Sequence, residues 1–77
     1  MADMPPLGTD ILTTFGTTVR RLRKKRQLSQ EELAEKSGIH RNYLSDVERG
    51  RRNIALKNII ALARALKVKP GRLLDGL

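Results

Sequence analysis

The sequence contains no cysteine and only two aromatic residues, Phe15 and Tyr43, among 77 residues. Without cysteine, neither a disulfide framework nor a zinc site with thiolate ligands can stabilise the chain. The single histidine, His40, cannot complete a metal site by itself. So few aromatic side chains also argue against the stacking surfaces that bind single-stranded nucleic acid. We therefore expect neither a metal ion nor a cofactor.

Long apolar segments are missing as well. No run approaches the roughly 20 apolar residues that a membrane-spanning helix needs. The first ten residues, MADMPPLGTD, lack the basic and then apolar regions of a signal peptide. No nucleophile–base set and no glycine-rich phosphate loop is present, and the chain is too short to enclose a pocket. We expect a cytoplasmic protein that is not an enzyme and has no catalytic residue, no membrane partner and no small-molecule ligand.

Positive charge is what the chain has in excess. Sixteen lysines and arginines stand against eight aspartates and glutamates, which gives a net charge of +8. Such an excess points to a polyanionic partner: DNA, RNA or an anionic membrane surface. A chain of this length makes one domain with a modest core. Its stability must come from helix packing, with oligomerisation as a further source.

The N-terminal part divides into a tail and a helix. Residues 1–9 hold two prolines and a glycine, and we expect a flexible tail there, followed by one domain over residues 10–77. Asp10 can cap a first helix that runs to about Arg26. Its apolar stripe consists of Ile11, Leu12, Phe15, Val19 and Leu22. The run RRLRKKR at its end is either a solvated helix end that adds long-range attraction or a direct phosphate contact, and composition alone also allows a nuclear-localisation signal.

The segment from Ser29 to Gly50, SQEELAEKSGIHRNYLSDVERG, predicts two short helices. Ser29 and Glu32 form a capping-box pattern at the start of the first helix, and Gly38 is expected to end it after Ser37. His40 is the expected N-cap of the next helix, and Gly50 its stop. Two short helices joined by a three-residue turn with glycine are typical of a helix-turn-helix.

The second of these helices has two different faces. Tyr43, Leu44 and Val47 form an inward stripe, whereas Asn42, Ser45, Asp46 and Arg49 lie on the opposite side, with Arg41 at the N-terminal tip. Taken alone, the polar face could be an ordinary solvated surface. The net charge and the capped helix-turn-helix spacing favour a surface that reads double-stranded DNA.

The remaining chain predicts a basic loop and two more helices. Arg51, Arg52 and Asn53 form the loop, a fourth helix covers about 56–66, and Pro70 suits the start of a short fifth helix. The predicted fold is all-α, a compact five-helix bundle with the helix-turn-helix in helices two and three. The fourth helix has an apolar arc that is wider than one core face needs, which indicates an interface. The residues expected there are Leu62, Leu66, Leu73 and Leu74.

The pattern of residues resembles a known family. The sequence resembles the Cro and phage-repressor type of helix-turn-helix domain in three motifs and their spacing. These motifs are LSQEELA, Gly38-Ile39 and LSDVERG. The stretch 41–53, RNYLSDVERGRRN, is similar in addition to the controller proteins of restriction–modification systems. The resemblance implies a homodimer on a two-fold symmetric operator. It also implies an internal ion pair between Arg23 and Glu48.

The resemblance further implies roles for the polar residues. Arg41, Asn42 and Asp46 lie where the family reads bases, with Tyr43 and Ser45 beside them. An arginine side chain can bind guanine through two hydrogen bonds, and an asparagine can bind adenine in the same way. Asp46 either accepts a hydrogen bond from cytosine or orients Arg49 or Arg41. The residues expected at DNA phosphates are Gln30, His40, Arg49, Arg51, Arg52, Asn53 and Lys57. An antitoxin that mainly holds a protein partner remains the alternative function.

Overall fold

The computed structural model describes residues 9–77, and side chains from residue 11 onward. The order is α1 (Thr9–Lys25), α2 (Gln30–Ser37), α3 (Arg41–Glu48), α4 (Leu56–Leu66) and η1 (Pro70–Leu74). The predicted all-α class is confirmed, and no strand occurs in this part of the chain. The predicted fifth α-helix is instead the 3₁₀-helix η1. It spans five residues, two of them Pro70 and Gly71, which is too short and too poor in helix formers for an α-helix.

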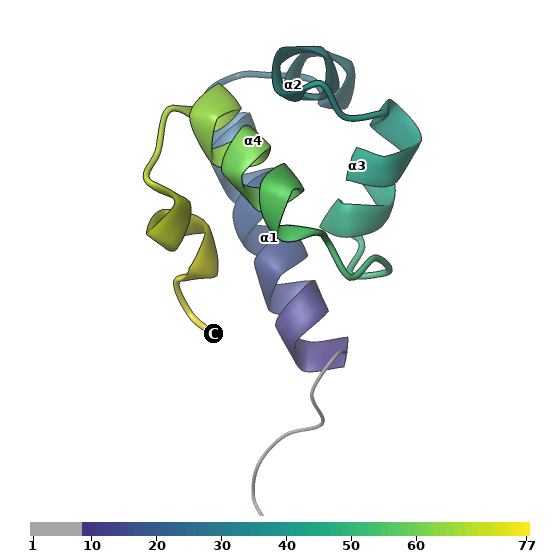
Figure 1. The fold of residues 1–77 in the computed structure, drawn as a ribbon, viewed down its shortest axis with the longest axis vertical. Helices are drawn as coiled ribbons and strands as arrows, with labels where there is room; N and C mark the ends of the chain where they lie inside the picture. The colour runs from purple at the N-terminus through teal and green to yellow at the C-terminus, as the bar shows by residue number, and fades with distance from the viewer. Residues whose placement is uncertain (1–8) are drawn as a thin grey trace, which may run out of the picture.

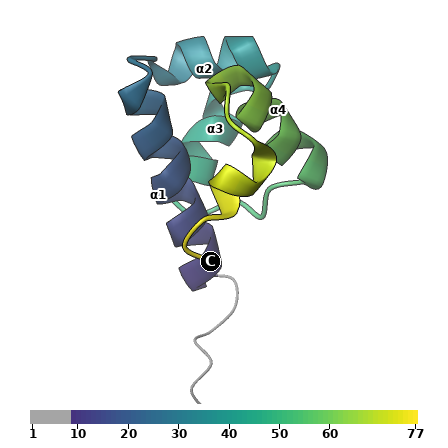
Figure 2. The ribbon, with the colours of Figure 1, turned by 90° about the vertical axis from the view of Figure 1, so that its left-hand side faces the viewer.

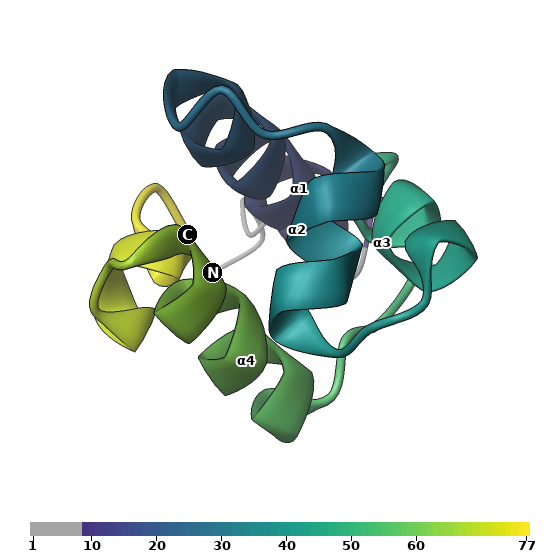
Figure 3. The same ribbon diagram turned by 90° about the horizontal axis from the view of Figure 1, so that it is seen from above.

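The four α-helices surround one core. α1 is the longest helix and runs along the long axis, with α2 lying across the end where α1 finishes (Figure 1). α3 packs against α1 and α2, and η1 packs against α1 and α4 (Figure 2). From above, α2 lies beside α3, and η1 lies on the far side of α4 from α3 (Figure 3). The helix-turn-helix therefore occupies one side of the molecule.

The start of α1 differs from the prediction. The helix begins at Thr9, so Asp10 lies inside it and not at the N-cap. Phe15, Val19 and Leu22 are buried as expected, but Ile11 is 39% exposed. The first turn extends beyond the other helices, and among residues 9–77 no other helix lies over it (Figure 1). The predicted tail lies outside the described residues, except for Thr9.

α2 is closed at both ends by local contacts. The Ser29 hydroxyl accepts from the Glu32 backbone N–H at 3.0 Å, and the Glu32 carboxylate accepts from the Ser29 N–H at 2.8 Å. The predicted capping box is thus present, and these bonds lower the pKa of Glu32. Because that pKa is lowered by folding, the capping box weakens as the pH falls through it. Gly38 ends the helix with a φ of 73°, as predicted.

The core contains the leucines that the sequence assigned to an interface. Leu62, Leu66 and Leu73 have no exposed surface in the single chain. The expectation that a chain this small cannot cover them is wrong, because α1, α2 and η1 all pack around α4. The large apolar side chains that are exposed among the described residues are Ile11, Leu56, Leu74 and Leu77. Leu74 is therefore the member of the predicted dimer set that remains available to a second chain.

Gly16 allows α1 and α3 to cross closely. A Cβ atom there would lie 2.2 Å from the Val47 carbonyl oxygen and 2.8 Å from that of Glu48. Real Cβ atoms do not approach backbone oxygens so closely. A side chain at position 16 would therefore force α1 and α3 apart. The sequence gives no signal for this role, since a glycine inside a helix is ordinarily only a weak helix former.

We expect Gly16→Ala to lower the free energy of unfolding by about 1–3 kcal/mol through this overpacking. Urea denaturation followed by circular dichroism measures the loss. Gly71→Ala is the matched control, because a Cβ at Gly71 would have no heavy atom within 4 Å. Equal stability of the two variants would contradict the packing role of Gly16.

Candidate nucleic-acid interface

Arg23 and Glu48 form a buried ion pair that connects α1, α3 and the segment before α2. Arg23 donates from Nε to Glu48 Oε2 at 2.7 Å and from Nη2 to Oε1 at 2.9 Å. A third bond runs from Arg23 Nη1 to the Leu28 carbonyl at 2.9 Å. Both residues are 8% exposed, and the hydrogen bond with Glu48 raises the pKa of Arg23 despite its burial. The predicted pair thus ties α1 to α3 and to the chain before α2.

Gln30 joins the same network. Its side-chain amide donates to Glu48 Oε1 at 3.0 Å. The residue expected at a DNA phosphate therefore also fixes the start of α2 against the end of α3. A charged carboxylate with four hydrogen-bond acceptor sites can accept from both Arg23 and Gln30 without leaving either unsatisfied. This network sets the position of α3 relative to α2.

α3 presents its predicted polar face outward. Arg41 and Asn42 are exposed, Ser45 and Asp46 are half-buried, and Leu44 and Val47 are buried. The predicted division holds for Leu44 and Val47 on the inside and for Arg41 and Asn42 on the outside. Tyr43, predicted to face inward, is half-buried, and Arg49 is the C-cap that follows the helix. The outward face carries hydrogen-bonding groups of the kind that read base edges in a major groove.

Tyr43 and Asp46 have partners within the chain. The Tyr43 hydroxyl accepts from the Ala55 backbone N–H at 3.3 Å, and the Arg52 guanidinium lies 4.7 Å from the centre of its ring. Arg52 Nη2 also donates to Asp46 Oδ2 at 3.4 Å. Asp46 thus pairs with Arg52 and not with Arg49 or Arg41, the two arginines that the sequence offered beside a contact with cytosine. Together these contacts fasten the basic loop to α3.

Arg41 lies next to a carboxylate that the sequence did not single out. Its Nε atom is 3.0 Å from Glu31 Oε2, and the two side chains are 54% and 67% exposed. Glu31 belongs to the first turn of α2, whereas Arg41 is the first residue of α3. No pattern in the sequence relates these positions, because the turn between the helices decides which side chains meet.

Exposed cations lie around α3, and the N-termini of α3 and α4 lack side-chain caps. His40 is the N-cap of α3 as predicted, but its side chain makes no capping hydrogen bond. α4 likewise begins without a side-chain cap, and Lys57 is exposed in its first turn. Neither helix has an acidic residue in its first turn, in contrast to α2. The other cations expected at phosphates, Arg49, Arg51 and Arg52, are exposed, as is Asn53.

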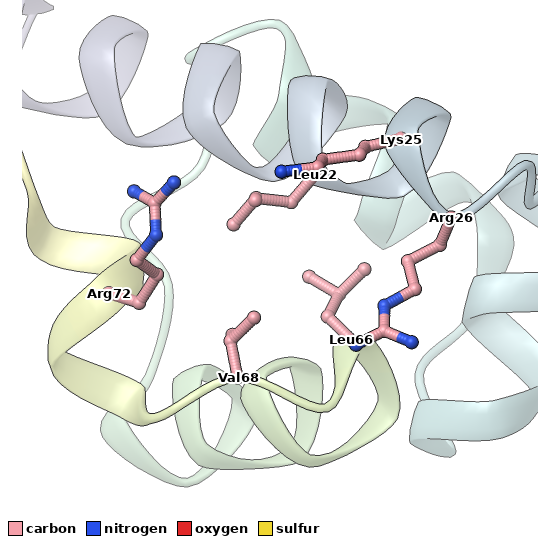
Figure 4. Close-up of a pocket in the computed structure, with 6 residues that line it drawn as sticks. All are labelled: Leu22, Lys25, Arg26, Leu66, Val68 and Arg72. Carbon is pink, nitrogen blue, oxygen red and sulfur yellow. The ribbon is translucent and has the colours of Figure 1, made fainter.

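The basic run at the end of α1 divides between two sides of the molecule. Arg20 lines a hollow of about 270 Å³ with Arg23, Gln30, Glu48 and Arg49. Lys25 and Arg26 instead line a hollow beside α4 and η1, where Arg72 lies opposite them (Figure 4). Leu22, Leu66 and Val68 form its apolar part (Figure 4). Arg20 is therefore an exposed member of the run that lies next to Gln30 and Arg49, which are expected at phosphates.

Within residues 9–77, no group of three or more potential ligands could hold a metal ion. None of the helices in that range is both long and apolar enough to span a membrane. What the described residues do contain is a fixed helix pair with a polar outer face and cations around it. Such an arrangement can contact base edges and phosphates at the same time.

Comparison with known proteins gives consistent matches. A family model described as helix-turn-helix matches residues 19–73. The control protein C.BamHI of Bacillus amyloliquefaciens is 48% identical over 70 residues, which cover 90% of this chain and 86% of that protein.

Solved structures agree with this match. The restriction-modification controller protein C.AhdI from Aeromonas hydrophila superposes with a TM-score of 0.80 at 50% identity, over 80% of this chain and 94% of the other. The biofilm master regulator SinR, solved in complex with DNA, gives a TM-score of 0.76 at 34% identity, over 79% of this chain and 98% of that chain.

Proposed function

Because this chain belongs to the helix-turn-helix family, we propose that it is a transcriptional regulator that binds double-stranded DNA in a sequence-specific manner. α3 enters the major groove, and its residues Arg41 and Asn42 reach base edges. The similarity to C.BamHI covers 90% of this chain and that to C.AhdI covers 80%, which supports a controller of a restriction–modification operon. The activity is binding, without catalysis.

The observation that carries this proposal is the outward face of α3. Arg41 and Asn42 are exposed at the start of a helix whose inner side chains Leu44 and Val47 are buried. The Arg23–Glu48 pair and Gln30 hold this helix at a defined position against α2. Side chains held on a rigid helix can read bases more precisely than side chains on a mobile loop.

We propose further that the protein acts as a homodimer on a pseudo-palindromic operator. Leu74 is 46% exposed and Leu77 is 54% exposed, and both lie at the η1 end of the chain. Two copies that meet through this end cover these side chains. Recognition helices of such dimers contact successive major grooves about 34 Å apart. The relatives named above are control proteins, and this favours a regulator over the alternative of an antitoxin bound to a different protein.

Arg41→Ala tests the proposed reading of bases. An arginine that contacts guanine O6 and N7 contributes about 1–3 kcal/mol to discrimination. We expect this loss in binding free energy on a duplex selected from a random pool, and a much smaller loss on a scrambled duplex. Fluorescence anisotropy at physiological ionic strength measures both affinities.

Lys57→Ala is the control for that experiment, because an exposed lysine at a phosphate contributes equally to all sequences. The affinity of the Lys57→Ala protein should fall by a similar factor on both duplexes. Its binding should also depend less on salt concentration than that of the wild type. If Arg41→Ala behaves in the same way as Lys57→Ala, then Arg41 contacts phosphate and not a base.

A further inference from the structure

Glu31 is an unexpected residue for a surface that faces DNA. It follows Gln30, which is expected at a phosphate, and its carboxylate is exposed. A carboxylate in this position repels the DNA backbone. The first turn of a helix does favour acidic side chains, but Glu32 already meets that preference and completes the capping box. Glu31 also helps to raise the pKa of the buried Arg23, and its contact with Arg41 suggests a second role on the outer surface.

The geometry of the pair with Arg41 indicates this second role. Glu31 Oε2 approaches the guanidinium of Arg41 from its Nε side, at 3.0 Å. The two terminal amines, Nη1 and Nη2, take part in none of the side-chain hydrogen bonds found among residues 11–77. An arginine that binds guanine end-on uses these two amines, one for O6 and one for N7. The carboxylate thus leaves the reading end of the side chain open.

Glu31 is also well placed to hold another side chain still. It lies in the first turn of α2, which the capping box and the Gln30–Glu48 hydrogen bond fix at its N-terminus. Arg41, in contrast, is 54% exposed and starts a helix that lacks a side-chain cap. A free arginine on such a surface loses considerable rotamer freedom when it binds. A partner on the neighbouring helix reduces the number of rotamers before DNA arrives.

We propose that Glu31 is a positioning residue that directs Arg41 toward a guanine in the operator. The proposal rests on the proposed function, because it requires Arg41 to read a base. Glu31 raises the preference for the operator over other sequences and does not raise affinity for DNA in general. Its negative charge weakens binding to any phosphate backbone, while its effect on Arg41 acts only where a guanine is in reach.

The experiment measures the ratio of affinities for the selected operator duplex and a scrambled duplex. We expect Glu31→Ala to lower this ratio about three- to fivefold, near the upper end of what exposed ion pairs contribute. Affinity for the scrambled duplex should stay the same or rise, because a negative charge is removed. Glu31→Gln keeps the length and an acceptor oxygen, so its ratio should lie between those of wild type and Glu31→Ala.

Two controls separate positioning from general electrostatics. Glu35→Ala removes the same charge from the same helix, one turn further on and exposed, and should leave the ratio unchanged. In an Arg41→Ala background, Glu31→Ala should also leave the ratio unchanged. A fall in the ratio that persists in this background would overturn the proposal. The proposal would also be overturned if Glu35→Ala or Glu31→Gln lowered the ratio of affinities as much as Glu31→Ala does.

Failure of this inference can be told from failure of the proposed function. If the wild-type protein binds operator and scrambled duplexes equally, the proposed function is wrong. If the wild type prefers the operator and Glu31→Ala leaves that preference intact, the positioning role alone is wrong. Circular dichroism and urea denaturation of each variant establish that a changed ratio does not result from unfolding.

Discussion

Replacing either Arg23 or Glu48 by alanine is expected to lower the free energy of unfolding by about 3–5 kcal/mol. Each change leaves the other charge buried, since both residues are 8% exposed. In Arg23→Ala, the buried Glu48 carboxylate keeps only its hydrogen bond from the Gln30 amide. The Leu28 carbonyl also loses its hydrogen bond from Arg23. Glu48→Ala strands a guanidinium within the bundle. For a chain of 77 residues, a loss of this size is a large part of the total stability.

A double-mutant cycle measures the interaction. The double variant Arg23→Ala/Glu48→Ala removes both charges, so it should be less destabilised than the sum of the two single changes. Urea denaturation of all four proteins gives the coupling free energy. Additive losses would show that the pair does not contribute as a unit. Arg20→Ala is a suitable control, because Arg20 lies one turn away on α1 and is exposed.

The second large effect concerns the leucines of α4 and η1. Leu62 is fully buried, so Leu62→Ala should lower the free energy of unfolding by about 2–5 kcal/mol, and Leu62→Glu should lower it further by burying an unpaired charge. If Leu62 and Leu73 were interface residues, as the sequence predicts, a charge at either position would separate two copies and leave the helices intact. With both side chains at 0% exposure, loss of helix content is now the expected result.

Leu74→Glu is the variant that addresses the dimer. Leu74 is 46% exposed, so the charge remains solvated in the single chain and the helix content should be retained. Sedimentation velocity should show weaker self-association than in the wild type, together with weaker binding to the full operator. A Leu74→Glu protein with wild-type self-association would place the interface elsewhere. A Leu62→Glu protein with wild-type thermal stability would contradict the packing of the core.

Local sequence signals predicted most of the helix boundaries. Ser29 with Glu32, and Gly38 in a left-handed conformation, are local features, and the predicted bounds of α2 match the structure. The N-cap of α3 also lies at His40 as predicted, although its side chain makes no capping hydrogen bond. Asp10 was misjudged because its own residue type suits an N-cap, although the helix already begins at Thr9.

What the sequence could not predict depends on contacts between elements. The burial of Leu62 follows from how α1, α2 and η1 enclose α4, and no periodicity within α4 contains that information. The close crossing at Gly16 and the meeting of Glu31 with Arg41 likewise depend on the angles between helices. Asp46 was given several possible partners, and the path of the loop brought Arg52 to it.

Whether α3 reads a particular DNA sequence is decided by comparing two binding affinities. Duplexes are selected from a random pool, and the affinity for the selected duplex is compared with that for a scrambled duplex of the same composition at physiological ionic strength. Specific regulators favour their site by a factor of about 10³ or more. We expect a ratio of this order, with a selected sequence that has two-fold symmetry and half-sites one helical turn apart. A ratio near one, with binding that depends on salt alone, would contradict the account.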